Sequence, residues 1–265
     1  MSDTTVVWHY GLMAERWALF SIDAPELPFF HQAIARFGQP VLDVGCGTGR
    51  VLLPLLRSGI DIDGCDISPD MLEQCRTTAT HEGLHPHLYA QPMHKLDLPR
   101  TYRTIYICNS LGLSAGREAD LATLRRCYEL LEHNGALIFN IQAEYTSPES
   151  WDMWLPKTRA ALPEPWPTEG RRRVAPDGNV HLAFFRFITM DPLEQRYTRQ
   201  VRLEKWQGDT LLAAEEYTLS GNMYLKNEML LMLQMAGFRE ITVHGDYTDE
   251  PATAEHGELV FTAVR

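Results

Sequence analysis

The sequence predicts an α/β protein whose parallel sheet has helices on both faces and which carries an antiparallel β insertion. The first observation is the alternation of short apolar runs with helical stripes between residues 40 and 141. The second is a change at 142, where a segment rich in tryptophan and proline precedes three strand-like stretches. The third is the return of a helical stripe and two strands between 222 and 265.

Two short helices are expected before the sheet, over 12–20 and 26–37. The alternation that follows predicts strands at 40–44, 60–66, 87–90, 104–108 and 136–141 and helices at 51–56, from 69 and over 121–131. Ser68-Pro69-Asp70 is a helix start, because serine caps the first turn, proline suits the first helical position and aspartate suits the helix dipole. Asn134-Gly135 is expected to end the helix over 121–131.

Residues 142–221 are predicted to form an insertion. Five prolines and three tryptophans make 148–170 a loop or irregular segment. Three strands over 180–190, 195–207 and 210–219, joined by turns, predict an antiparallel meander. A helix ending at Gly237 and strands at 239–244 and 258–264 complete the chain.

The composition disfavours several classes of partner. Lysine and arginine number 24 against 35 aspartate and glutamate in 265 residues, a net charge of −11. This balance argues against nucleic acid and anionic membrane surfaces, although the run Arg171-Arg172-Arg173 is locally basic. No apolar stretch is long enough for a membrane span, and Asp3 and Glu15 are atypical of a signal peptide. Five cysteines without a Cys-x-x-Cys pair predict reduced thiols, a cytoplasmic location and no metal site.

The glycine-rich segment after the first predicted strand indicates a ligand site. Asp43 precedes a turn with glycines at 45, 47 and 49, and a helix follows. Glycines allow the backbone to approach a ligand closely, and amides at a helix start suit an anionic group. Asp66 ends the next strand roughly 20 residues later, where a carboxylate can accept ribose hydroxyls. The G-x-G-x-G spacing and Asp43 favour a cationic nucleoside, such as S-adenosylmethionine, over a dinucleotide.

The runs VLDVGCGTGR and DIDGCDISPDML resemble motifs I and II of the class I S-adenosylmethionine-dependent methyltransferases, and LLMLQMAGFREITVHGDY is similar to the C-terminal part of bacterial small-molecule members. The resemblance implies a Rossmann-like seven-stranded sheet in the order 3-2-1-4-5-7-6 with strand 7 antiparallel. It divides the chain into an N-terminal helical cap (1–39), a cofactor-binding core (40–141 and 222–265) and an antiparallel insertion (142–221) that covers the substrate or forms a dimer surface.

The resemblance also implies roles for individual residues. The methionine end of the cofactor is expected at Asp43, Gly45, Cys46 and Gly47, the ribose at Asp66, and the adenine at Ile67 and Met71. Gln91-Pro92-Met93 occupies the adenine-edge position, where Pro92 replaces an aspartate that the family often has, so Gln91 or backbone atoms must serve. Asn109 follows the fourth strand beside the sulfonium, and Tyr10 resembles a tyrosine that folds over the cofactor.

The sequence contains no motif that identifies a catalytic base. His9, Tyr10 and His181 are candidates, since an imidazole suits neutral proton transfer, and ordinary packing is the alternative for each. Trp151 and Trp154 either line a substrate pocket or pack between the insertion and the core. His81, His85 and His87 straddle a helix end and are interpreted as surface residues.

The function that follows is in-line transfer of a methyl group from S-adenosylmethionine to an N or O nucleophile of a small molecule. A non-catalytic S-adenosylmethionine sensor or partner subunit with the same fold is the alternative. The sequence leaves the acceptor open, because the segments expected to bind it, 1–30 and 142–221, contain no motif. A homodimer formed through the insertion is a further expectation.

Overall fold

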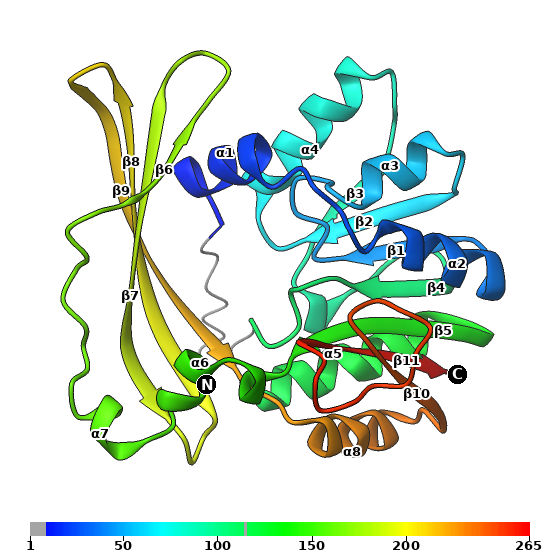
Figure 1. The fold of residues 1–265 in the computed structure, drawn as a ribbon. Coiled ribbons are helices and arrows are strands. Elements are labelled where there is room, and N and C mark those ends of the chain that lie inside the picture. Colours follow the sequence, from blue (N-terminus) through cyan, green and yellow to red (C-terminus); the bar gives the residue numbers. More distant parts are fainter. Residues whose placement is uncertain (1–8, 114–115) are drawn as a thin grey trace.

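A seven-stranded sheet forms the core of the computed structural model, which describes residues 9–113 and 116–265 (Figure 1). Its strands are β1 (Val41–Val44), β2 (Ile62–Asp66), β3 (His87–Ala90), β4 (Tyr102–Ile107), β5 (Leu131–Gln142), β10 (Glu240–Gly245) and β11 (Glu258–Val264). The order is β3-β2-β1-β4-β5-β11-β10, with β11 antiparallel to both of its neighbours. The predicted order 3-2-1-4-5-7-6 with a reversed seventh strand is confirmed.

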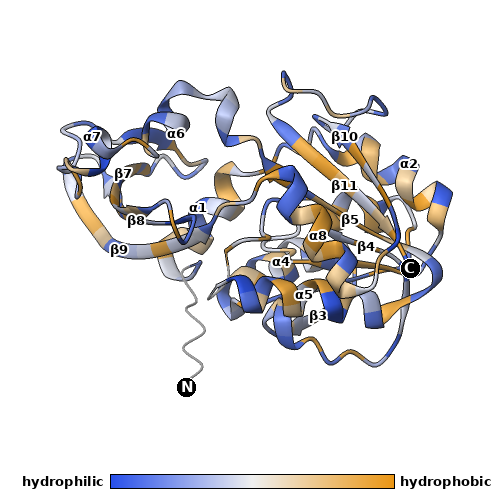
Figure 2. Ribbon diagram, turned by 90° about the horizontal axis from the view of Figure 1, so that it is seen from below, coloured by the Kyte–Doolittle hydropathy of each residue, from blue (hydrophilic) through white to orange (hydrophobic). Residues whose placement is uncertain are grey.

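Helices cover both faces of this sheet, as the alternating pattern predicted. They are α2 (Leu27–Phe37), α3 (Leu52–Arg57), α4 (Pro69–His81), α5 (Arg117–Leu130) and α8 (Lys226–Ala236). The apolar sides of α2, α3 and α4 share one buried cluster, and those of α5 and α8 share another. Figure 2 shows hydrophobic residues along β11 and α8, where the second cluster lies. Ser68 caps α4 as expected, its hydroxyl accepting a bond from the Met71 amide at 3.2 Å.

A second sheet of four antiparallel strands stands beside the core. Its strands are β6 (Arg171–Val174), β7 (Val180–Asp191), β8 (Arg196–Gln207) and β9 (Thr210–Asn222). The meander of the last three was predicted, whereas β6 was not. Helix α1 (Gly11–Phe20) lies between this sheet and the core (Figure 1), where Leu12 and Met13 pack on Ala183, Val201 and Leu203. Residues 1–8 of the predicted cap lie outside the described residues.

Two expectations are corrected in the connecting segments. Helix α5 ends at Leu130 rather than at Asn134-Gly135, because the buried Leu131 is extended and pairs with Tyr102 of β4. Gly135 lies inside β5 instead, where a Cβ would stand 2.8 Å from the Arg103 carbonyl oxygen. The segment 148–170 contains two short helices, α6 (Pro148–Asp152) and α7 (Pro156–Arg159), each beginning with a proline at its first position.

Short 3₁₀ turns complete the path of the chain, η1 (Met93–Lys95) after β3 and η2 (Glu144–Thr146) after β5. None of the helices in the described ranges is long and apolar enough to cross a membrane.

A buried carboxylate joins α5 to the segment that leads from the second sheet back to the core. Asp120 is fully buried, and its Oδ2 accepts bonds from the Tyr224 hydroxyl at 2.5 Å and the Asn222 side-chain amide at 2.6 Å. Hydrogen bonds to a charged group are among the stronger ones in proteins, and breaking a buried network leaves its partners unsatisfied. Asp120 therefore fixes the point where the insertion rejoins the core.

We expect Asp120→Ala to lower the free energy of unfolding by about 2–4 kcal/mol, because two buried donors lose their acceptor. Urea denaturation measures the change. Glu118→Ala, which removes an exposed carboxylate from the same helix, is the control and should change stability by less than about 0.5 kcal/mol. Equal stability of the two variants would contradict this role for Asp120.

Candidate functional site

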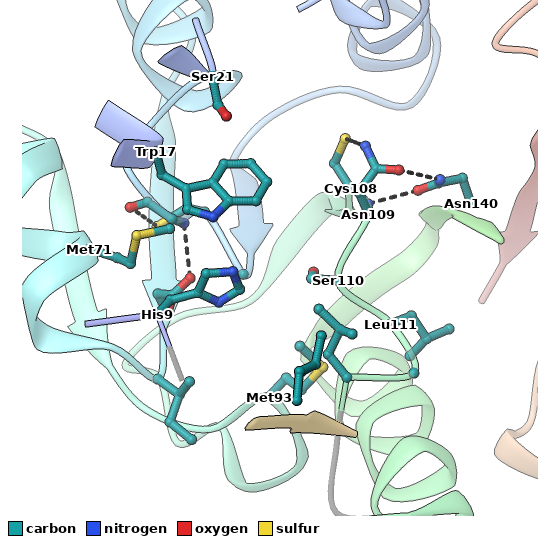
Figure 3. A pocket seen from close by; sticks show the side chains of 18 of the residues that line it. His9, Trp17, Ser21, Met71, Met93, Cys108, Asn109, Ser110, Leu111 and Asn140 are labelled. Carbon is teal, nitrogen blue, oxygen red and sulfur yellow. Dashed lines mark hydrogen bonds between the residues drawn. The ribbon is translucent and has the colours of Figure 1, made fainter. Parts of the chain in front are cut away.

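A cavity of about 1070 Å³ opens at the carboxyl ends of β1, β2 and β4. The glycine-rich loop and the start of α4 form one wall, the segment 108–113 after β4 forms a second, and residues of β8 and β9 close the side toward the other sheet. Figure 3 shows His9, Trp17 and Ser21 on one side and Cys108, Asn109 and Asn140 on the other. The carboxyl edge of an open α/β sheet is the usual place for a ligand.

The glycine-rich loop approaches its neighbours too closely for side chains. Gly45 has a φ of 76°, and a Cβ there would lie 2.4 Å from the Ser110 hydroxyl oxygen. The Gly45 and Cys46 amides donate to the Cys65 carbonyl at 2.8 and 2.9 Å, which ties the loop to β2. The loop backbone, rather than side chains, therefore forms the floor of the cavity.

Asp66 connects the loop to the end of β2. Its Oδ2 accepts a bond from the Gly47 amide at 2.9 Å, and its Oδ1 accepts one from the Ser68 amide at 2.8 Å. Burial raises the pKa of this carboxyl, while the backbone amides of Ser68, Gly47 and Ile67 act in the opposite direction. Each oxygen retains acceptor capacity for a ligand donor in the cavity.

Asp43 is a buried acid directly beneath the loop. Burial raises the pKa of its carboxyl from 3.8 to about 7, against the lowering effects of the Tyr106 hydroxyl and Arg50 and with smaller raising effects of Asp66 and Glu26. A carboxylate that is costly to ionise without a partner is stabilised by a cation placed beside it. The site therefore favours a positively charged ligand over an anionic one.

The segment after β4 is held by a pair of asparagines. Asn109 has a φ of 56°, and its amide donates to Asn140 Oδ1 at 2.8 Å. Asn140 Nδ2 donates in turn to Asn109 Oδ1 at 2.7 Å and to Glu258 Oε2 at 2.7 Å. Asparagine adopts positive φ more readily than most residues, and these bonds fix the conformation. Asn109 is thereby held at the cavity wall (Figure 3).

Arg50, immediately after the glycine loop, belongs to a second polar cluster of the cavity. Its guanidinium donates to the Asp23 carbonyl at 2.7 Å and pairs with Glu26. The Cys108 thiol donates to Glu26 Oε1 at 3.0 Å, and burial raises the pKa of that thiol. Arg50 thus fastens the segment between α1 and α2 to the core, so the cavity wall beside Ser21 and Asp23 is attached to the glycine loop.

Comparison with known proteins shows a family match in the core of the chain. The methyltransferase domain family matches residues 41–135, which include the glycine loop, Asp66 and β4. This part of the chain is a methyltransferase domain.

Two bacterial relatives are putative methyltransferases. GWCH70_2453 of Geobacillus sp. is 29% identical over 122 residues, which are 44% of this chain and 49% of that protein. YqeM of Bacillus subtilis is 22% identical over 84% of this chain and 83% of its own length. The chain thus spans about half of the first relative and most of the second.

Solved methyltransferases share the fold of the whole chain. An S-adenosylmethionine-dependent methyltransferase from Clostridium acetobutylicum has a TM-score of 0.71 at 14% identity, over 96% of this chain and 97% of its own. The sugar N-methyltransferase KedS8 from Streptoalloteichus has a TM-score of 0.69 at 18% identity, over 98% and 94%. The likeness covers the second sheet as well as the core.

The fold brings most of the predicted cofactor residues together. The following line the cavity: Asp43, Gly45, Cys46, Gly47, Asp66, Ile67, Met71, Gln91, Met93 and Asn109. The side-chain amide of Gln91, however, exchanges bonds with the Asp97 backbone, at 3.1 and 2.7 Å. Gln91 is therefore held against the Asp97 backbone, and its predicted contact with the adenine edge stays a prediction.

Other predicted residues lie apart from the cavity lining. Tyr10 is 43% exposed and packs edge-on against Tyr217, with its carbonyl accepting the Tyr217 hydroxyl. His181 is buried behind α1, with its Nε2 3.7 Å from Glu15 Oε1. Trp151 and Trp154 pack on one another, the latter against a cluster of methionines that includes Met153. Their positions follow from packing that the local sequence does not specify.

His9 is the candidate base that does line the cavity, where its ring packs edge-on against Trp17 (Figure 3). Burial and the nearby Arg199 lower its pKa to about 3, so the imidazole is neutral at physiological pH.

Several cavity residues were missed by sequence reasoning. They are Glu26, Arg50, Asn140, Glu144, Tyr197 and Arg199. Arg50 had a usable signal, since it directly follows the glycine motif. Tyr197 and Arg199 had none, because only the placement of β8 against the core brings them to the cavity.

The residues present fit S-adenosylmethionine. The glycine loop lines the cavity and packs too closely on Ser110 for a Cβ at Gly45, the buried Asp43 favours a cation, and Asp66 stands at the strand end with acceptor capacity left. Met71 and Ile67 supply apolar surface beside it.

The raised pKa of Asp43 predicts a pH-dependent stability without cofactor. The folded protein holds this proton more tightly than the unfolded chain, so stability from this group is lost as pH rises from about 4 to about 7. Asp43→Asn removes the cost of ionisation. We expect the variant to gain about 2–4 kcal/mol over the wild type between pH 4 and pH 8.

Urea unfolding of both proteins across that pH range tests this expectation. Glu73→Gln, an exposed position on α4, is the control and should track the wild type. A stability difference between Asp43→Asn and the wild type that stays constant with pH would contradict the assignment.

Proposed function

We propose that this methyltransferase transfers the methyl group of S-adenosylmethionine to an N or O nucleophile of a small molecule. The observation that carries the proposal is the single cavity that runs from the glycine loop to the face of the second sheet. One end offers the predicted cofactor residues, and the other offers aromatic and polar side chains for an acceptor, such as Trp17, Tyr197 and Glu144. A cavity of about 1070 Å³ suits two small molecules and not a polymer surface.

Several similar proteins support a small acceptor by their names. KedS8 is a sugar N-methyltransferase, and DauC of Streptomyces, 30% identical over 38% of this chain and 47% of its own, is an aklanonic acid methyltransferase. We infer an acceptor of comparable size for this chain. A cytoplasmic location and a homodimer formed through 142–221 stay predictions.

The protein's part in the reaction is mainly positioning. When bound, S-adenosylmethionine supplies an electrophilic methyl group on a sulfonium that leaves as a neutral thioether. Asp43 and Asp66 hold the cofactor by charge and hydrogen bonds, and the Asn109–Asn140 pair fixes the wall beside it. Trp17 and the inner face of β8–β9 exclude water from the acceptor end. Holding nucleophile and electrophile in line in a dry cavity supplies most of the rate enhancement.

A proton acceptor is required only when the nucleophile carries a proton into the reaction. Glu144 is the group at the acceptor end that can take it. Burial raises the pKa of the Glu144 carboxyl, which makes it a stronger base than an exposed glutamate. His9 also lines the cavity, but with a pKa of about 3 its imidazole is too weak a base at neutral pH. We propose Glu144 as the proton acceptor of an O-methylation or of an ammonium substrate.

Transfer of a labelled methyl group to a panel of small amines, phenols and hydroxylated compounds tests the function. We expect turnover with members of this panel and none with RNA or protein. Transfer to RNA or protein alone would overturn the proposal. Binding of S-adenosylmethionine without any transfer would favour the non-catalytic alternative.

The proposed role of Asp66 predicts a loss of cofactor affinity. Asp66→Ala removes a charged acceptor and should weaken S-adenosylmethionine binding by about 1.5–3 kcal/mol, or roughly 10–150-fold in Kd. Isothermal titration calorimetry measures the change. Glu73→Ala on the exposed face of α4 is the matched control, and an unchanged Kd for Asp66→Ala would refute the ribose role.

A further inference from the structure

Three consecutive arginines on the edge strand β6 point to different faces of the second sheet. In an antiparallel pair, residues opposite one another share a face. Arg171 lies opposite Ala183 and Arg173 opposite His181, whereas Arg172 lies opposite Leu182. Ala183 packs on α1, and the His181 ring packs on Phe20 of α1 at 5.4 Å. Arg171 and Arg173 therefore stand on the face toward α1, and Arg172 on the opposite face.

Arg16 of α1 meets these two arginines from the other side. Its guanidinium lies 5.4 Å from the Phe20 ring centre, and that of Arg171 lies 5.0 Å from the Phe185 ring centre. Arg16 Nη1 is buried without a hydrogen-bond partner among the described residues. Burial, Arg173 and Arg171 all lower the pKa of Arg16, as expected when like charges approach each other.

The surrounding acids do not neutralise this cluster. Glu15 Oε1 is engaged by Lys205 Nζ at 2.6 Å and lies 3.7 Å from His181 Nε2. Asp177, at the turn between β6 and β7, binds the Asn179 amide and is exposed. In the described part of the chain, Arg16, Arg171 and Arg173 form no ion pair, although the protein as a whole has a net charge of −11.

We propose that Arg16, Arg171 and Arg173 form a binding site for a phosphate-class anion between α1 and β6. Guanidinium groups bind phosphate oxygens in pairs, so three of them suit a multiply charged anion better than a single carboxylate. Trp17 and Phe20, the neighbours of Arg16 on α1, line the cavity itself, whereas the three arginines do not. The anion is therefore either a free one from solvent or a group of the acceptor that extends past α1, and the experiments below separate the two.

Calorimetric titration with inorganic pyrophosphate at constant, low ionic strength tests the site. We expect saturable binding to the wild type and a roughly tenfold or larger loss for Arg171→Gln and for Arg173→Gln. Arg172→Gln is the matched control, since it removes the same charge from the same strand but on the other face, and it should bind pyrophosphate as the wild type does. Absence of saturable binding, or an equal loss in Arg172→Gln, would overturn the proposal.

Binding of S-adenosylhomocysteine to each variant is a separate measurement of folding and of the cofactor site. This binding should be unchanged in all three variants. Absence of S-adenosylhomocysteine binding would count against the proposed function and not against the anion site.

Inhibition kinetics distinguish an anionic group of the acceptor from a free anion. This experiment rests on the proposed function. The assay uses an acceptor from the methyl-transfer panel. If pyrophosphate competes with this acceptor in the wild type, and the competition is lost in Arg173→Gln, the anion is part of the acceptor. Pyrophosphate that binds without competing identifies a free anion. Both results support the site, whereas competition that is equally strong in Arg173→Gln contradicts it.

Discussion

The cavity depends on the bond between the Gly47 amide and the Asp66 carboxylate, which joins the loop after β1 to the end of β2. Parallel pairing of β1 with β2 and β4 brings their carboxyl ends to one edge. At Gly45 the loop then has no room for a side chain, since even a methyl group there would overlap Ser110. Cofactor space, acid placement and the position of Asn109 all follow from this close approach.

Two places beside α1 and the glycine loop differ in the charge that they favour. At the loop, Asp43 is kept out of water, so ionisation of its carboxyl is favoured only beside a cation. Between α1 and β6, Arg16, Arg171 and Arg173 form no ion pair with the acids of the described residues. The first place therefore favours a cation, and we propose that the second binds an anion.

Attachment of the second sheet to the core makes the acceptor end of the cavity. Asp120 binds Asn222 and Tyr224 where the second sheet returns to the core, and α1 packs on the second sheet. Arg50 binds Asp23 and Glu26 and so holds the segment after α1 on the core. These three attachments lie in segments that are distant in sequence.

The sequence by itself determined the α/β core and, through its family resemblance, the strand order. It also predicted the cofactor residues from Asp43 to Met71, which the structure brings to one cavity. These features depend on short-range signals: a glycine loop after an apolar strand, a capped helix start and an acid at a strand end. Only the tertiary structure decided that His9 rather than Tyr10 or His181 lines the cavity, that α5 ends at Leu130, and that Tyr197 and Arg199 face the core. The physical reason is that packing between elements far apart in the chain sets which face of a strand or helix is covered, and local periodicity does not specify that partner.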